Sequence, residues 1–272
     1  MKNKLFLMLI ILVYSNVETY AQGDLLITPN RVIFEGRKTK EVLNLLNTGK
    51  ETTTFSVSFV QRHMNEDGSF TIISSDEPGQ MFADPYIRIY PRQVTLLPGE
   101  AQVVMLQRRR KADMQDGEYR SHLFFRSEKN YNALGKQNKD PSKAFSVEIT
   151  PIFGISIPII IRSGELSAIA TLSDLKLENQ QNTQLTFTLN RKGKSSIYGD
   201  FTVEYFPLKG KSYIIGVMKG VAVYTTINKR YMSIKLNKTP GMNLDTGILK
   251  LKYTSRGSGE KREVHAVEDL QI

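Results

Sequence analysis

The sequence contains no cysteine and no tryptophan among its 272 residues. A chain without cysteine forms no disulfide bond, and it has neither a thiol nucleophile nor a cysteine-based zinc site. Its stability must therefore come from a hydrophobic core, which this length allows for one or two domains. Because tryptophan and any clustered aromatic platform are also lacking, a carbohydrate-binding β-sandwich is disfavoured.

Histidine is scarce as well, and the recognisable catalytic motifs are absent. The three histidines, His63, His122 and His265, do not have the spacing of metal ligands. The sequence contains no GxSxG, no glycine-rich phosphate loop and no HExxH motif. We therefore expect a protein that is not an enzyme, with no catalytic residue, no metal site and no cofactor.

The one long apolar run lies at the N-terminus, in residues 5–14. It follows Lys2 and Lys4 and is too short to span a bilayer, which takes about 20 residues. A sequence typical of a signal-peptide cleavage site follows and ends at the small residue Ala21. Residues 1–21 therefore resemble a secretory signal peptide that is cleaved after Ala21. We expect export to a bacterial periplasm and no stable membrane insertion.

The net charge of +10 does not indicate a nucleic-acid partner, because an exported protein seldom meets nucleic acid. The basic run at 108–111 follows an apolar strand-like segment and precedes a turn. We interpret it as a solvated strand end. The basic surface remains suited to acidic proteins.

Alternation of apolar and polar residues, which is typical of β-strands, recurs from residue 25 onward. Turn sequences separate the strands, among them NTGK (47–50), NEDG (65–68) and LPGE (97–100). No convincing apolar stripe of helical period follows the signal peptide. The alternation restarts after a predicted hinge at Ser163-Gly164-Glu165. The sequence therefore predicts an all-β protein of two immunoglobulin-like β-sandwich domains, 22–162 and 163–272, joined by a short hinge.

The longest alternating segment is AFSVEITPIFGISIPIIIR, residues 144–162. It is far longer than the usual strand of about 5–6 residues, and a polar segment at 127–143 predicts a long loop before it. Pro151 and Pro158 favour an edge strand, because proline cannot donate a hydrogen bond within a sheet. An apolar edge strand also invites pairing with another chain, including capping by a second copy in a dimer.

Four stretches, in their order and spacing, resemble the periplasmic chaperones of the chaperone–usher pilus pathway, the PapD-like family. They are PNRVIFEG (29–36), PRQVTLLPGE (91–100), DGEYRSHLFF (116–125) and the long segment that ends in Arg162. The resemblance covers about residues 25–165 and is weaker beyond. The chain thus resembles a divergent member of this family.

The resemblance implies a chaperone that lends a strand to an incomplete immunoglobulin-like pilin or surface subunit, with an outer-membrane usher as a further partner. In such β-addition, main-chain hydrogen bonds give affinity and alternate side chains fill pockets of the client. The side chains matching this role are Phe145, Val147, Ile149, Phe153, Ile155 and Ile157. The alternative is a strand that packs on its own core, which we favour from about Ile155 onward.

Two further roles are implied by the same resemblance. The family holds the client's C-terminal carboxylate with two basic residues, and Arg31 matches the first. The second has no counterpart, because no lysine or arginine lies between Phe145 and Ile161. The family also orients its domains with a buried ionic trio, which is matched by Glu118, Arg162 and Asp245.

A function of a different class fits the same fold. An immunoglobulin-like protein of the cell surface could use the two sandwiches for structure or adhesion, without capturing subunits. Binding of clients through residues 145–157 separates the two hypotheses.

Overall fold

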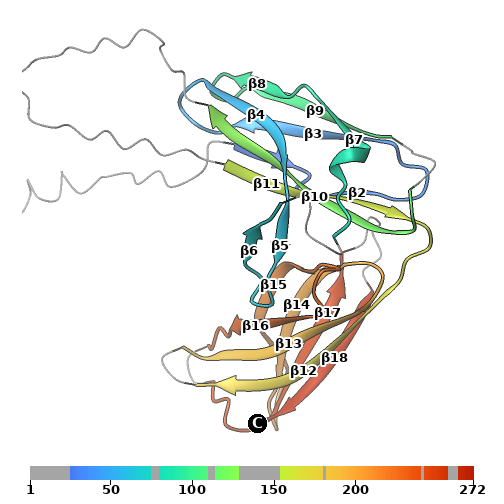
Figure 1. Cartoon of the computed structure of the whole chain (residues 1–272). Helices are drawn as coiled ribbons and strands as arrows, with labels where there is room; N and C mark the ends of the chain where they lie inside the picture. Colours follow the sequence, from blue (N-terminus) through green and yellow to red (C-terminus); the bar gives the residue numbers. More distant parts are fainter. Residues whose placement is uncertain are drawn as a thin grey trace, which may run out of the picture.

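β-strands make up nearly all of the regular structure, as the alternating sequence predicts, and the one exception among the described residues is a 3-10 turn, η1 (Asp84–Tyr86). The computed structural model describes residues 25–74, 80–109, 114–128, 154–179, 182–239, 242–256 and 263–272. The predicted signal peptide lies outside these ranges. The prediction of an all-β protein built from two β-sandwiches is confirmed (Figure 1).

The N-terminal sandwich consists of two packed sheets. The first has the order β1-β3-β9-β7, with bounds Leu25–Thr28, Lys40–Asn47, Ala101–Arg108 and Ile87–Tyr90. The second has the order β2-β11-β10-β4-β8, with bounds Val32–Phe34, Gly154–Ser163, Gly117–Glu128, Thr53–Val60 and Gln93–Leu96. All neighbours are antiparallel except β11 and β2, which run parallel.

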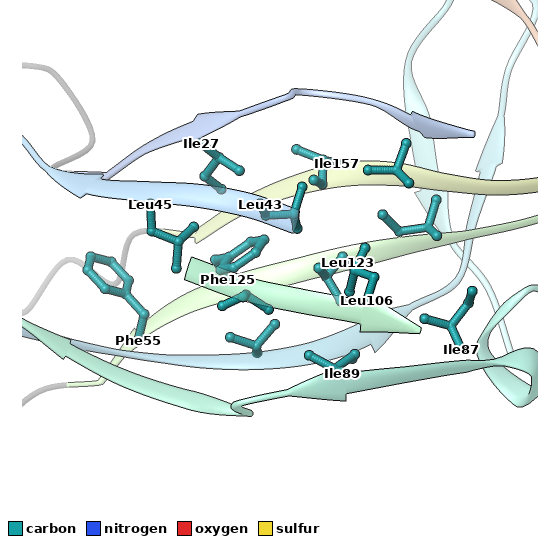
Figure 2. Packing of buried hydrophobic residues seen from close by; sticks show 14 of the residues in the cluster. Ile27, Leu43, Leu45, Phe55, Ile87, Ile89, Leu106, Leu123, Phe125 and Ile157 are labelled. Carbon is teal, nitrogen blue, oxygen red and sulfur yellow. The ribbon is translucent and has the colours of Figure 1, made fainter. Parts of the chain in front are cut away.

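The core between these sheets follows from the two-residue period of the strands. In β3, Leu43 and Leu45 are fully buried while the residues between and before them are more exposed. Figure 2 shows them facing Phe125 of β10 and Ile157 of β11 across the space between the sheets. The apolar rows of distant segments therefore meet in one core.

The C-terminal sandwich repeats this arrangement with its own core. One sheet has the order β12-β13-β16, with bounds Ala168–Glu178, Gln184–Gly193 and Lys229–Lys235. The other has the order β15-β14-β17-β18, with bounds Tyr213–Val223, Ile197–Phe206, Ile248–Ser255 and Val264–Gln271. Phe201 packs between the rings of Phe187 and Tyr253 at the centre of this core.

A short hairpin reaches from the N-terminal sandwich toward the C-terminal one (Figure 1). It consists of β5 (Arg62–Met64) and β6 (Phe70–Ile72), which turn at the predicted NEDG sequence. The Tyr231 amide of β16 donates a hydrogen bond to the Glu66 carbonyl at 2.7 Å. Gly68, at φ +85°, lies where a Cβ atom would collide with the Arg230 guanidinium. The hairpin is thus a second connection between the sandwiches besides the chain segment 164–167.

A small apolar cluster joins the two sandwiches. Ile160 of β11 and Met64 of the hairpin pack against Ala222 and Tyr224. Over the described ranges, we find no helix whose length and hydrophobicity would allow it to cross a membrane.

Replacement of Leu45 by alanine should lower the free energy of unfolding by about 2–5 kcal/mol, because it leaves a cavity in a closely packed core. Leu26, on the neighbouring strand β1, is half exposed, so Leu26→Ala serves as the matched control and should cost about 0.5 kcal/mol or less. Urea denaturation of both variants measures the difference. Equal losses would contradict the burial assigned to β3.

Candidate functional site

Strand β11 is paired along its whole length on one side and along only part of it on the other. Residues Gly154–Ser163 pair with β10, whereas β2 pairs only with Ile159–Ile161. Among the described residues, nothing pairs with 154–158 on the side away from β10. This half of β11 is therefore a sheet edge that lies next to the predicted donor segment.

The side chains of β11 alternate between two environments. Ile157, Ile159 and Ile161 point into the core of the N-terminal sandwich, and Ile155 packs partly against the end of that core. Ile160 faces the other way and packs against the C-terminal sandwich. From Ile155 onward, the odd-numbered side chains of β11 thus pack on the core of their own domain, as we favoured.

The position of Ile157 corrects its inclusion in the predicted donor row. Its side chain is 3% exposed and faces the sheet formed by β1, β3 and β9 (Figure 2), so it is already used by the protein's own core. The other donor positions, Phe145, Val147, Ile149 and Phe153, lie outside the described residues.

Arg31, the predicted carboxylate anchor, lies at the junction of the two sandwiches. It directly precedes β2, and its guanidinium donates hydrogen bonds to the Tyr224 hydroxyl at 3.1 Å and to Ser196 Oγ at 3.2 Å. The same group lies over the rings of Tyr198 and Tyr224, 4.6 and 5.3 Å from their centroids. Arg31 is therefore half-buried between the sandwiches, and its Nε atom has no hydrogen-bond partner among the described residues.

Arg120 of β10 is a second cation at this junction. Its guanidinium lies 3.9 Å from the Tyr224 ring centroid, and its Nη2 donates to the Arg62 carbonyl at 2.9 Å. Burial lowers the pKa of Arg120 to about 10, against the opposing effects of Tyr224 and Glu118. It therefore still carries its charge at neutral pH. Arg120 pairs in register with Ile160, so the junction gains from β10 a cation that β11 lacks.

His122 lies on the same face of β10 as Arg120. Its ring contacts Phe70 and Tyr224 edge to face, at centroid distances of 5.3 and 6.3 Å. Burial, together with the charges of Arg120, Arg62 and Arg31, lowers the pKa of His122 to about 3. The imidazole is thus neutral at any physiological pH.

Glu118 and Arg162 form an ion pair that reaches the C-terminal sandwich. The fully buried Glu118 Oε2 accepts hydrogen bonds from Arg162 Nε at 3.1 Å and from the Ser196 amide and hydroxyl at 2.9 Å each. Arg162 Nη2 donates to the Ser196 carbonyl at 3.1 Å. Two of the three predicted trio members therefore meet, and they meet at the backbone of Ser196.

The assignment of Asp245 to this trio is wrong. Asp245 is exposed in the loop before β17, where the neighbouring Gly247 amide donates to the Ile272 carbonyl. The Tyr205 hydroxyl, near the far end of β14, donates to carbonyls of the same loop. Because Ser196 precedes the start of β14 and a strand rises about 3.3 Å per residue, this loop lies a strand length away from Glu118. The other carboxylate at Arg162 is that of Glu35, at 3.6 Å and largely exposed.

Three residues of the junction were missed in the sequence. Arg120 had a local signal, because it follows Glu118 by two positions and therefore shares its strand face. Ser196 and Tyr224 had none, because their contacts depend on how two sandwiches distant in sequence pack together.

Lowering the pH from 7 to 5 should reduce the free energy of unfolding by about 2 kcal/mol through His122 alone. The unfolded imidazole, with an ordinary pKa near 6.5, takes up a proton in this interval and the folded one does not. The stability is therefore complete above about pH 6.5 and declines as the pH falls toward 3. Denaturation of His122→Phe, which retains an aromatic ring, should show this decline removed, whereas replacement of the exposed His265 by glutamine should leave it unchanged.

Replacement of Arg162 by alanine should loosen the two sandwiches, because the buried Glu118 carboxylate loses a charged donor. Small-angle X-ray scattering should report a broader distribution of interatomic distances. Asp245→Ala is the control and should scatter like the wild type, because Asp245 lies away from the junction. Unchanged scattering of Arg162→Ala would show that the ion pair does not hold the arrangement.

No family model and no curated protein sequence matches this chain. Among solved structures, it is similar to the YadV chaperone, with 12% identity over 92% of this chain and 100% of the other, at a TM-score of 0.46. The complex of the CsuC chaperone with the CsuE tip subunit from Csu pili of Acinetobacter baumannii gives 15% identity, coverages of 91% and 98%, and a TM-score of 0.46. The CupB2 chaperone of Pseudomonas aeruginosa shows 12% identity over 91% of this chain and 100% of the other, at a TM-score of 0.42. At these identities and TM-scores, the similarity does not bear on function.

Proposed function

We propose that the protein is a non-enzymatic chaperone that binds incomplete immunoglobulin-like subunits by adding its own strand to their sheet. The observation that carries this proposal is the edge of β11 over residues 154–158, with which no other described strand pairs. A strand edge offers a row of main-chain donors and acceptors, and a partner that lacks one strand offers the complementary row. The predicted donor segment, 145–153, leads directly into this edge.

The apolar face of the donor supports the same proposal. In β11, the odd-numbered residues from Ile155 to Ile161 point toward the core side of the sheet. In a complex that extends β11 toward its N-terminus, the same register places Phe145, Val147, Ile149 and Phe153 on one face. Each buried side chain of this size contributes about 1.5–3 kcal/mol before the cost of ordering the segment.

The junction supplies positive charge beside Ile160 of β11. Arg31, Arg62 and Arg120 lie around Tyr224 and His122, and within the described part of the chain Arg31 Nε has no hydrogen-bond partner. This charge supports Arg31 as the residue that binds a client's terminal carboxylate. The carboxylate would compete with Tyr224 and Ser196 for the hydrogen bonds of the Arg31 guanidinium. Arg120 and Arg62 strengthen the positive potential there, in place of the basic residue that β11 lacks.

The proposed clients are exported pilin-like or surface subunits, which the chaperone meets in the periplasm. Binding by an outer-membrane usher stays a prediction that follows from the same proposal. A second copy of the chain is the alternative occupant of the free edge, because an unpaired apolar strand also pairs with itself.

The double variant Ile149→Asp/Phe153→Asp should lose client binding by at least 100-fold, because two charges would enter the apolar groove of the subunit. The measurement is recovery of periplasmic proteins on the immobilised chaperone, with mass spectrometry to identify incomplete immunoglobulin-like subunits. Hydrogen exchange of the wild-type complex should show new protection of the amides at 154–157.

The matched control is Ser146→Asp/Thr150→Asp, which adds the same charge to the same segment on the opposite face. It should retain most of the binding. Equal recovery with all three proteins would contradict donation by this strand and favour the structural or adhesive protein. A dimer of the wild type that Ile149→Asp/Phe153→Asp dissolves, without any client, would assign the edge to self-pairing.

A further inference from the structure

A hollow of about 400 Å³ lies on the outer face of the N-terminal sandwich, over β7 and β9. Ile87 and Ile89 of β7 point into the core (Figure 2), so the residues that alternate with them point outward. The same holds along β9, where Leu106 is buried and its neighbours are exposed. The outward side chains of both segments line the hollow, and they are Arg88, Tyr90, Arg92, Met105, Gln107 and Arg109.

The strand register brings three arginines to this one hollow. Arg88 of β7 pairs with Gln107 of β9, and Arg109 follows Gln107 by two residues on the same face. Such diagonal neighbours lie within reach of long side chains. Arg92 follows Tyr90 by two residues and lines the same hollow. Three positively charged side chains that are separate in sequence therefore border a single concave surface.

The three arginines are exposed, so a dissolved ligand can reach their guanidinium groups. No carboxylate lines the hollow, and none of the described residues forms an ion pair with Arg88, Arg92 or Arg109. In the C-terminal sandwich, by contrast, Lys250 pairs with Asp269. The positive potential of the hollow is therefore not neutralised by the protein itself, and it favours an anion.

The number of guanidinium groups indicates which anion fits. Each arginine offers a planar fork of donors that matches the oxygens of a carboxylate or a phosphate. A carboxylate has two oxygens and one charge, whereas a phosphate monoester has three terminal oxygens and about 1.5 to 2 negative charges at neutral pH. Three arginines around one hollow therefore match a phosphate monoester better than a carboxylate.

The rest of the hollow has room for the group that carries the phosphate. Its volume lies within the range of small-molecule sites, which begins at about 300 Å³. Tyr90 is 76% exposed and Met105 is 41% exposed, and the two pair in register across β7 and β9. They offer an apolar surface beside the three charges.

We propose that this hollow binds a phosphate monoester. Arg88, Arg92 and Arg109 donate hydrogen bonds to its terminal oxygens, and the esterified group lies over Tyr90 and Met105. Arg109 belongs to the basic run at 108–111 that the sequence indicated as a solvated strand end. The site is distinct from the free edge of β11, because β7 and β9 belong to the other sheet, and the proposal does not depend on the chaperone function.

The phosphate monoester can belong to a soluble metabolite or to a lipid headgroup, and two binding measurements on the mature protein distinguish these sources. Isothermal titration calorimetry uses sn-glycerol 3-phosphate and glucose 6-phosphate, and cosedimentation uses phosphatidylcholine vesicles with and without phosphatidic acid. We expect a Kd below about 1 mM at low salt for a soluble ester, for phosphatidic acid, or for both. Absence of binding to the esters and to both kinds of vesicle would overturn the site.

Two further measurements test the assignment of the anion. Succinate, which carries two carboxylates, should bind at least 10-fold more weakly than the phosphate ester, and equal binding would overturn the assignment to phosphate. The affinity for the ester should fall several-fold between pH 7.5 and pH 5, because the ester has a second pKa of about 6 and loses one negative charge. An affinity that does not change over this interval would contradict the proposed recognition of the dianion.

The double variant Arg88→Gln/Arg109→Gln locates the binding and should weaken it at least 10-fold. The matched control is Arg37→Gln/Arg126→Gln, which removes the same charge from exposed positions of the same sandwich that do not line the hollow. It should bind like the wild type. Because all four side chains are exposed, both variants should keep the wild-type melting temperature within about 2 °C. Equal affinities of the two double variants would place the ligand elsewhere and contradict the proposal.

Discussion

The Glu118 carboxylate is the charge on which the arrangement of the two sandwiches depends. It belongs to the N-terminal sandwich, yet two of the three donors to its Oε2 come from Ser196 at the start of the C-terminal one. A buried carboxylate is tolerated only when it is paired and hydrogen-bonded, so separation of the sandwiches would leave this charge short of partners until water replaced them. Hydrogen bonds to a charged acceptor are also the stronger kind, and they are directional. The junction thus combines directional hydrogen bonds with the apolar cluster around Ile160.

An aromatic residue holds together an otherwise repulsive set of charges around this carboxylate. The Tyr224 hydroxyl accepts a hydrogen bond from Arg31, and its ring lies close to the guanidinium groups of both Arg31 and Arg120. The ring face offers negative potential to both cations, and His122 adds no further charge because it remains neutral. The β5–β6 hairpin covers the same region through Phe70. The excess of positive charge in the sequence is therefore partly concentrated at one internal surface.

The period of two along the strands predicted the β-sandwich fold, because alternation is a local property of the chain. It correctly indicated a strand through Arg162 and a turn at NEDG, whereas the edge character of the segment around Pro151 stays a prediction because that segment lies outside the described residues. Alternation does not say which part of the protein each face of a strand packs against. Ile157 joins its own core and Ile160 the other sandwich, although both belong to one apolar run. The match of Asp245 to an acidic residue in a loop failed for the same reason, since a short motif does not state at which end of a sandwich its loop lies. Arg120 was within reach of the sequence, because its two-residue spacing from Glu118 is enough to place both on one face.

The core-facing isoleucines of β11 fix how this strand is aligned in its own sheet. Ile157, Ile159 and Ile161 hold the strand in a single alignment, because a shift by one residue would turn all three out of the core and bring polar or bulky neighbours in. Any chain that pairs along the free edge would therefore meet a strand whose core-facing and outward-facing residues are already fixed. Such a partner could shift along β11 only in steps of two residues if its own side chains are to keep the same face. A partner of the kind proposed would therefore have to match this pattern of faces before its individual pockets are filled.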